Sequence, residues 1–427
     1  MNYSKRKFLS NKMKTYKKKL QRYRHFQLKH ILYYEKQWQY INLKFNRIIL
    51  HGIQFVSIGE TVPRLFNLIE DLNKEDKKVL HVVLPVFFDY YSGGIYNRRM
   101  FDIFGKKIYF IKDSNLDVWT YIFLFHASRI NMEYFDKYKS ARLGPTKVSA
   151  NKYLLPFTNK ERKEGERKMK EIGVQGEFIC IHAREAKVKL ADFNKRAAYE
   201  SKCRECDIGT FEKTCRYFMS KNIQSVRMGK YETHICNTDF MIDYANLYHD
   251  EFMDFYLSSK CKFFIGCDSG LQSISGFYGK PVLATNMTSI CYGWESLADS
   301  GYDLYMPKKF YSKTKKRYLN LYEMLDAMNV CAIKTSEFVK NRIVLEDNTE
   351  DEILEAAKEM NARIEKQWKE TIEEKKHYEK YWRILEEWKT NNKVSKVRED
   401  GGFAGYTMNF YKISYTFLKN NLYLLDI

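Results

Sequence analysis

The sequence lacks the long apolar segment that a membrane-spanning helix requires. No window of its 427 residues reaches the roughly 18 apolar residues needed to cross a bilayer. The first residues are rich in lysine and arginine at the place where a secretory signal carries its apolar core. We therefore expect the protein to stay in the cytoplasm.

A disulfide framework is also missing. The nine cysteines follow no even spacing, and a chain of this length does not need cross-links to hold its core. Cys203 and Cys206 form a C-x-x-C pair, but no second pair follows at zinc-finger spacing. The alternative is a metal site in which Cys215 and His182 join this pair. We predict a reducing compartment and no bound metal.

Several catalytic signatures are absent. The chain contains no P-loop, no H-E-x-x-H, no G-x-S-x-G and no D-x-D at the end of a predicted strand. These absences argue against P-loop nucleotide hydrolysis, zincin proteolysis, α/β-hydrolase chemistry and metal-dependent sugar transfer. We predict that the protein uses no cofactor.

Acidic residues are absent from the first 34 positions, which hold eleven lysines and arginines out of a net formal charge of +20. Apolar residues recur there at helical spacing, so residues 1–50 are predicted to form a basic helical arm. This asymmetry points to an anionic partner, either a membrane surface or a nucleic acid. The alternative is a solvated tail. This positive charge lies in the arm and outside the predicted α/β body of the protein, which disfavours nucleic acid as the partner.

The remainder alternates short β-branched runs with helical patterns, as a parallel sheet with covering helices does. Pro145 and Pro156 lie in an aperiodic stretch, residues 134–157, that we assign to an interdomain linker. The predicted domains are 51–150 and 151–345. The predicted strands are 53–59, 79–85, 108–111, 178–183, 225–229, 241–244, 262–266 and 281–285. One predicted helix follows the first strand and runs through Leu72, and another begins near residue 97. Further helices are predicted at 116–129, 158–173, 209–221, 251–260 and 271–278.

The last part of the chain, residues 346–427, is predicted to be helical and to pack back on both domains. Residues 349–392 combine helical periodicity with interspersed charges, which is typical of long surface helices. The segment 403–425 is too apolar to be a free tail. We expect it to pack on the body of the protein.

Three loops that follow predicted strands carry groups suited to phosphate or sugar chemistry. His182 and Arg184 follow the first strand of the second domain, where a guanidinium can hold a diphosphate bidentately. The loop G-C-D-S-G-L at 266–271 offers glycines, a hydroxyl and exposed amides to an anion. Glu60 follows the first strand of the chain, where a carboxylate can accept a proton from an attacking hydroxyl. The structural alternatives are a surface ion pair, a helix cap and a dipole partner, respectively.

These loops resemble those of known sugar-transfer enzymes. G-E-T-V-P-R-L at 59–65 and the run 263–283 are similar to the G-D and D-T/S-G loops of the heptosyltransferases of bacterial surface-polysaccharide synthesis. H-A-R at 182–184 looks like the H-x-R of fucosyltransferases. The run from residue 155 to about 290 resembles a family of bacterial glycosyltransferases of surface-glycan biosynthesis. The resemblance is weaker over 53–110.

This resemblance implies the α/β class and the GT-B fold, in which two Rossmann-like domains face a cleft. The first domain would hold the acceptor, and the second would bind the nucleotide sugar. The donor-binding residues implied by position are His182, Arg184, Arg204, Arg227, Asp268, Ser269 and Gly270. Glu60 replaces the heptosyltransferase aspartate and is the candidate catalytic base. Gln272 and Ser273 stand where heptosyltransferases have a nearby histidine, which leaves the donor's identity open.

The sequence therefore predicts a hexosyl- or heptosyl-type glycosyltransferase. It would be inverting and metal-independent, and it would move sugar from a nucleotide sugar to a glycan or a lipid-linked acceptor of polysaccharide or lipopolysaccharide biosynthesis. Residues 1–34 would attach it as a peripheral protein to the anionic inner face of the cytoplasmic membrane. The alternatives are a nucleic-acid-binding protein and a catalytically inactive scaffold of glycan synthesis.

Overall fold

The computed structural model divides the chain into two compact units, Met1–Ala141 and Arg142–Ile427. The sequence had placed this boundary at residue 150. The residues that the structure describes are 47–54, 62, 65, 79–86, 97, 99–105, 109–110, 132–135, 156–185, 199–230, 238–288, 301–331, 334–392 and 412–426.

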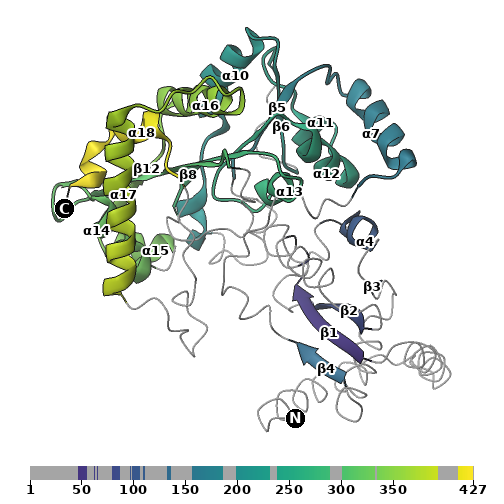
Figure 1. Cartoon of the computed structure of the whole chain (residues 1–427), viewed down its shortest axis with the longest axis horizontal. Helices are drawn as coiled ribbons and strands as arrows, with labels where there is room; N and C mark the ends of the chain where they lie inside the picture. The colour runs from purple at the N-terminus through teal and green to yellow at the C-terminus, as the bar shows by residue number, and fades with distance from the viewer. Residues whose placement is uncertain are drawn as a thin grey trace. The chain divides into compact units, whose positions relative to one another are not determined.

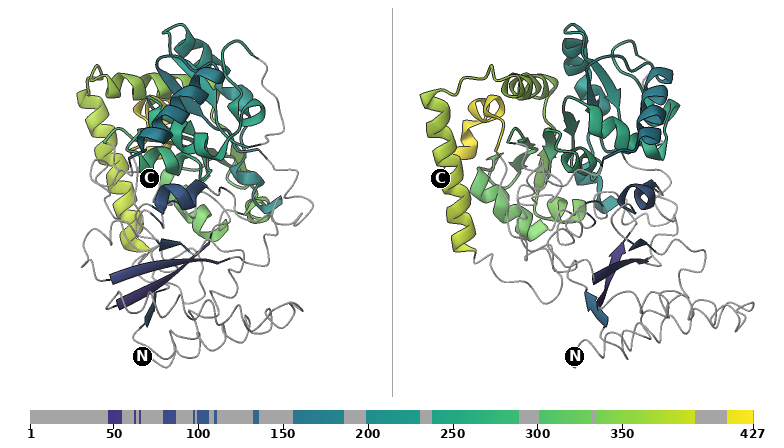
Figure 2. Two further views of the ribbon diagram at one scale, coloured as in Figure 1. Left: turned by 90° about the vertical axis from the view of Figure 1, so that its right-hand side faces the viewer. Right: turned by 45° about the vertical axis from the view of Figure 1, so that its right-hand side comes forward.

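Unit 1 contains a sheet of parallel strands in the order β3-β2-β1-β4. This order matches the 3-2-1-4 part of a dinucleotide-binding sheet, in which the strand order reverses between the first and the fourth strand. Figure 2 shows β1 and β2 side by side. The described elements are β1 (Arg47–Gln54), β2 (Val79–Val86), α4 (Arg99–Phe104), β3 (Tyr109–Phe110) and β4 (Met132–Phe135).

The predictions for unit 1 meet the structure unevenly. β2 and β3 lie where strands were predicted, whereas β1 begins at Arg47, before the predicted range 53–59. The predicted helix at 116–129 and the predicted base Glu60 lie outside the described residues.

Unit 2 is built on a parallel sheet with the order β6-β5-β7-β8-β9. Numbered along the chain, this is the 2-1-3-4-5 order of doubly wound folds, and the strand order reverses between β5 and β7. β5 reads F-I-C-I and is buried throughout, as expected for a parallel strand covered on both faces. The strands are β5 (Phe178–Ile181), β6 (Gln224–Arg227), β7 (Phe264–Gly266), β8 (Val282–Met287) and β9 (Leu304–Pro307).

Helices cover both faces of this sheet (Figure 1). On one face α10 packs against β6 and α16, and on the other α12 packs against α7 and α13. Successive side chains of a strand serve opposite faces. The helices are α7 (Asn159–Glu171), α10 (Glu212–Met219), α11 (Tyr244–Leu247), α12 (Glu251–Lys260), α13 (Gln272–Phe277) and α16 (Glu350–Ile364). The prediction of an α/β class with parallel sheets in both halves is confirmed.

Local capping explains where two of these helices begin. Thr158 and Glu161 form the predicted capping box at the start of α7. Asp250 accepts hydrogen bonds from the amides of Phe252 and Met253 at the start of α12. The predicted strand at 241–244 is wrong, because only Ile242 bridges to β6 and the next residues form the short helix α11.

The C-terminal elements belong to unit 2. α16 and α17 are surface helices, as expected, and each buries one face in the core, with Ile353 and Trp388 among the covered side chains. Figure 2 shows the end of the chain beside α17. Further elements are β10 (Lys309–Ser312), β11 (Arg317–Tyr318), α14 (Leu321–Cys331), α15 (Thr335–Lys340), β12 (Ile343–Glu346), α17 (Ile372–Asn391), α18 (Tyr415–Asn420) and η4 (Leu422–Leu425).

The chain end packs as predicted in the part that is described. Ile413 pairs in parallel with Tyr305 beside β9, and Phe417 and Leu418 are fully buried. β10, β11 and β12 form a small antiparallel sheet that was not predicted from the sequence. None of the helices in the described ranges is long and apolar enough to cross a membrane.

Candidate functional site

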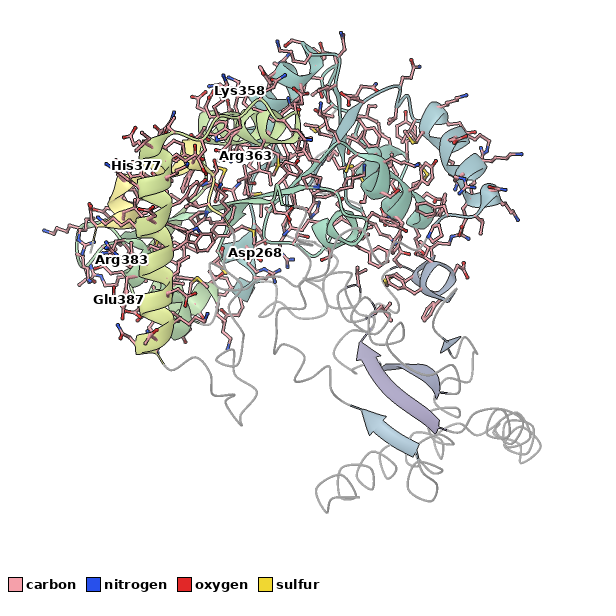
Figure 3. The ribbon with its side chains drawn as sticks, viewed as in Figure 1. Asp268, Lys358, Arg363, His377, Arg383 and Glu387 are labelled. Carbon is pink, nitrogen blue, oxygen red and sulfur yellow. The ribbon has the colours of Figure 1, made fainter. Side chains whose placement is uncertain are left out.

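The candidate site lies at the carboxyl ends of β5 and β7, where the strand order of unit 2 reverses. Ligands of open α/β sheets bind outside the strand ends at this kind of position. The chain leaving β5 carries His182 and Arg184, and the chain leaving β7 carries Asp268 and Ser269. Figure 3 labels Asp268 apart from Lys358 and Arg363 of α16 in this view.

His182 joins the ends of β5, β6 and β7. Its ring Nδ1 lies 2.9 Å from the carbonyl oxygen of Met228, and its Nε2 lies 3.0 Å from Oγ of Ser269. The side chain is only 6% exposed. Because a carbonyl oxygen can only accept, Nδ1 carries a proton in this arrangement. His182 therefore fixes the hydroxyl of Ser269 in place.

Arg184 is held in place by hydrogen bonds of its backbone and not by its guanidinium group. Its amide donates to Sγ of Cys267 at 2.9 Å, and its carbonyl accepts from the amide of Cys206 at 3.1 Å. Within the described part of the chain, no hydrogen bond or ion pair engages its guanidinium. Burial lowers the pKa of Arg184, and the neighbouring charge of Arg204 lowers it further. An anion at this point would relieve both effects.

Arg204 is the second cation of the site and lies on η1 (Lys202–Arg204). Its Nη2 donates to the carbonyl oxygen of Asp268 at 2.9 Å, and its Nε lies 3.2 Å from the Asp268 carboxylate. Three contacts fix η1: Cys203 N donates to Oγ1 of Thr335, Thr288 donates to Cys203 O, and the buried Lys308 ammonium donates to Glu205 O. These contacts place Arg204 before any ligand arrives.

The loop after β7 supplies the remaining predicted donor residues. Asp268 is 1% exposed and Ser269 is 9% exposed, so the loop is set into the protein, and Gly270 follows it half-buried. Gly270 accepts a hydrogen bond at its carbonyl oxygen from the amide of Ser273. The side-chain hydrogen-bonding groups of Gln272 and of Ser273 are buried and lack a partner among the described residues. Such groups are costly to leave unsatisfied and mark places where a ligand can supply the missing bond.

Arg227 has a different environment from the other two arginines. It is fully buried, its Nη2 lies 2.7 Å from Glu185, and its Nη1 lies 3.3 Å from Asp243. Both carboxylates are themselves nearly or completely buried. The structure therefore gives Arg227 the task of tying the end of β6 to the residue after Arg184. Direct contact between Arg227 and a donor stays a prediction.

Glu205 is a titratable group of the site that the sequence reading did not single out. Burial raises the pKa of this half-buried carboxyl, although Arg184, Lys202 and Lys308 lower it. Its position directly after Arg204 was visible, but its proximity to Arg184 comes from the folded loop. A second missed feature is the pairing of His182 with Ser269, which are far apart in the sequence.

The structure thus brings together His182, Arg184, Arg204, Asp268 and Ser269, with Gly270 in the same loop. Whether they bind a donor stays a prediction, as does the role of Glu60. The alternative metal set does not assemble, since no cluster of three metal-ligating side chains occurs among the described residues. Cys206 lies instead against Cys267, and that contact together with burial raises its pKa.

No protein-family model matches the chain, and no curated protein sequence does. Several solved glycosyltransferases are similar to it in structure. The family 9 glycosyltransferase of Veillonella parvula is 12% identical, with 75% of this chain and 98% of that chain covered and a TM-score of 0.46. The ADP-heptose LPS heptosyltransferase II of E. coli is 11% identical, with 62% and 90% covered and a TM-score of 0.41.

The E. coli heptosyltransferase WaaC with ADP is 8% identical, with 61% of this chain and 93% of that chain covered and a TM-score of 0.32. The expected resemblance to heptosyltransferases is thus present as a distant structural similarity. At these values the similarity assigns no residue and no reaction.

Proposed function

We propose that this protein is a glycosyltransferase and that unit 2 binds the diphosphate of its nucleotide-sugar donor at the ends of β5 and β7. One observation carries the proposal: Arg184, whose guanidinium forms no hydrogen bond or ion pair with the described residues, lies close to Arg204 and to the Asp268 loop where the strand order reverses. A diphosphate is the anion that fits two neighbouring guanidiniums and a hydroxyl.

The electrostatics of the site favour an anionic ligand. Arg227 is matched by two carboxylates and Arg204 by one, whereas Arg184 has a lowered pKa because of burial and of Arg204. A half-buried guanidinium that forms no ion pair with the described residues is only partly compensated by the nearby Asp268 and Glu205 carboxylates, and a bound diphosphate supplies further negative charge. The binding free energy of the ligand would therefore include the electrostatic stabilisation of the Arg184 guanidinium.

The same groups suit the chemistry of sugar transfer. As the bond between the anomeric carbon and the phosphate oxygen breaks, negative charge develops on the departing nucleoside diphosphate. Preorganised cations at this point stabilise that charge in the transition state. Glu60 remains the proposed base for the acceptor hydroxyl, with inversion at the anomeric carbon and no metal ion. We propose a hexosyl- or heptosyl-type reaction on a glycan or lipid-linked acceptor, by a cytoplasmic enzyme that its basic arm attaches to the membrane.

Ligand binding tests the proposal directly. The purified protein is screened by thermal shift with ADP, GDP, UDP and the nucleotide sugars ADP-glucose, GDP-mannose and UDP-glucose. A ligand that binds the native state raises the melting temperature. We expect a shift with one nucleotide class that Arg184→Ala abolishes.

Arg167→Ala is the matched control, because Arg167 lies on the exposed surface of α7 in an ion pair with Glu171. It should keep the full shift. The proposal is wrong if no member of the panel stabilises the protein, or if Arg184→Ala binds as well as the wild type does.

A further inference from the structure

His182 and Ser269 form a hydrogen-bonded chain whose proton positions are restricted. The carbonyl oxygen of Met228 can only accept, so Nδ1 of His182 donates to it at 2.9 Å. In a neutral imidazole the other nitrogen, Nε2, then has a lone pair and no proton. At 3.0 Å from Nε2, the hydroxyl of Ser269 must donate its proton to the ring.

This arrangement is unsuited to binding a phosphate oxygen. An ionised phosphate only accepts hydrogen bonds, and the single hydroxyl proton of Ser269 is already engaged with His182. Ser269 can donate to phosphate and keep its hydrogen bond to His182 only if Nε2 acquires its own proton and donates to Oγ in turn. We propose that binding of a diphosphate at Ser269 is coupled to the uptake of one proton from solvent by Nε2 of His182. This inference rests on the proposed function and assigns His182 a positioning role through Ser269.

The charges around His182 agree with this coupling. Among the described residues, the charged and titratable groups on the elements that meet there are Arg184 and Glu185 after β5, Arg227 on β6, Cys267 and Asp268 after β7, Lys202 and Arg204 on η1, and Glu205 directly after it. Glu185 and Asp243 match Arg227, and Asp268 matches Arg204. Arg184 is left as a cation that disfavours a second positive charge on the imidazole. The negative charges of a diphosphate reverse that balance and favour the imidazolium.

Two consequences follow for the proposed reaction. The complex holds one proton more than the free protein. As the pH rises, the affinity for the donor therefore falls by up to about tenfold per pH unit where His182 is neutral in the free state. The imidazolium also places a further positive charge close to the diphosphate while the bond to the sugar breaks. After the nucleoside diphosphate leaves, the proton returns to solvent.

The test is a calorimetric titration at pH 7.5 in two buffers, HEPES and Tris, that differ in their enthalpy of ionisation. The ligands are ADP-glucose, GDP-mannose and UDP-glucose, whose diphosphates are esterified at both ends and gain no proton near neutral pH. The difference in heat between the buffers gives the number of protons taken up. For the wild type we expect uptake that approaches one proton per bound nucleotide sugar.

Two variants remove the coupling in different ways. Ser269→Ala deletes the hydroxyl that forces the proton onto the ring, and His182→Asn removes the titrating group. Both should bind more weakly and with no proton uptake. His249→Asn is the matched control, since His249 is also buried in unit 2 but pairs with Asp254 outside the site. It should take up protons as the wild type does.

The outcomes separate this inference from the proposed function. If none of the three nucleotide sugars binds, the proposed function fails. If one binds without proton uptake, or if Ser269→Ala keeps the uptake, the coupling is wrong while the proposed function stands. Should His182→Asn not fold, nitrogen-15 NMR of the wild-type histidines gives the same answer. The ring of His182 should change from one protonated nitrogen to two when the nucleotide sugar is added.

Discussion

Unit 2 contains two buried polar clusters that differ in how their charge is balanced. The first surrounds Glu359 of α16, whose carboxylate accepts hydrogen bonds from the backbone of Tyr415 and Thr416 and from the hydroxyls of Ser414 and Thr416. Arg363 completes this cluster by pairing with both Glu359 and Glu374. The donors and acceptors of this cluster therefore satisfy one another within the described residues, and no charge of Glu359 or Arg363 is left without a partner there.

The second cluster lies at the ends of β5 and β7 and combines the buried His182 and Asp268 with the half-buried Arg184 and Arg204. There the guanidinium of Arg184 has no partner within the described residues, and burial lowers its pKa. Gln272 and Ser273 add buried hydrogen-bonding groups without partners in the described part of the chain. Both clusters therefore contain buried polar groups. The candidate site differs from the structural network around Glu359 because one of its guanidinium groups, that of Arg184, forms no ion pair with the described residues.

The largest expected effect concerns the polar cluster around Glu359. Glu359→Ala removes the carboxylate that accepts hydrogen bonds from residues 414–416 and leaves several buried donors unsatisfied. Breaking a buried charged network in this way costs about 3–5 kcal/mol of unfolding free energy. Urea denaturation measures it. Glu355→Ala, on the exposed side of the same helix, should change the stability by less than about 0.5 kcal/mol.

The second prediction compares two arginines. Arg184→Ala should weaken nucleotide-sugar binding by about 10- to 100-fold, since a hydrogen bond to a charged group contributes about 1.5–3 kcal/mol. It should leave the stability of the free protein unchanged or raised, because it removes a half-buried cation that forms no ion pair with the described residues. Arg363→Ala should instead lower the stability of the protein and leave nucleotide-sugar binding unchanged. Equal losses of stability in both variants would remove the distinction between the clusters.

The smallest expected effect concerns Glu205. Its pKa is raised in the folded protein, mainly by burial, so the native state holds its proton more tightly than the unfolded chain does. The contribution of Glu205 to stability is therefore present at low pH and is lost as the pH rises through the raised value. Glu205→Gln should flatten the fall in unfolding free energy above the ordinary pKa of a glutamate. Urea denaturation between pH 4 and pH 8 measures this. An unchanged pH profile in Glu205→Gln would contradict it, with the exposed Glu212→Gln as control.

The sequence predicted the helices and parallel strands that depend on local pattern. α12 begins and ends as expected, because Asp250 caps it and apolar residues fill it. The pattern failed at 241–244, where apolar residues reach the core from a bridge and a short helix. It also gave no signal for the small antiparallel sheet, in which β10 and β11 form a local hairpin and β12 joins from beyond α14 and α15.

The candidate site shows the same limit. Arg184 and Arg227 both follow strands of unit 2, and the sequence assigns both to the donor. Only the folded structure shows that Glu185 and Asp243 neutralise Arg227 and leave Arg184 without a partner among the described residues. Which arginine has charge to offer is decided by tertiary packing, which no spacing along the chain reveals.

The central claim is that the charge at the ends of β5 and β7 belongs to a diphosphate site. A crystal structure of the protein with the nucleotide sugar that gives the largest thermal shift tests it most directly. The diphosphate should lie within hydrogen-bonding distance of the Arg184 guanidinium and of Oγ of Ser269. A diphosphate bound elsewhere on the protein, with Arg184 making no contact to it, would contradict the account.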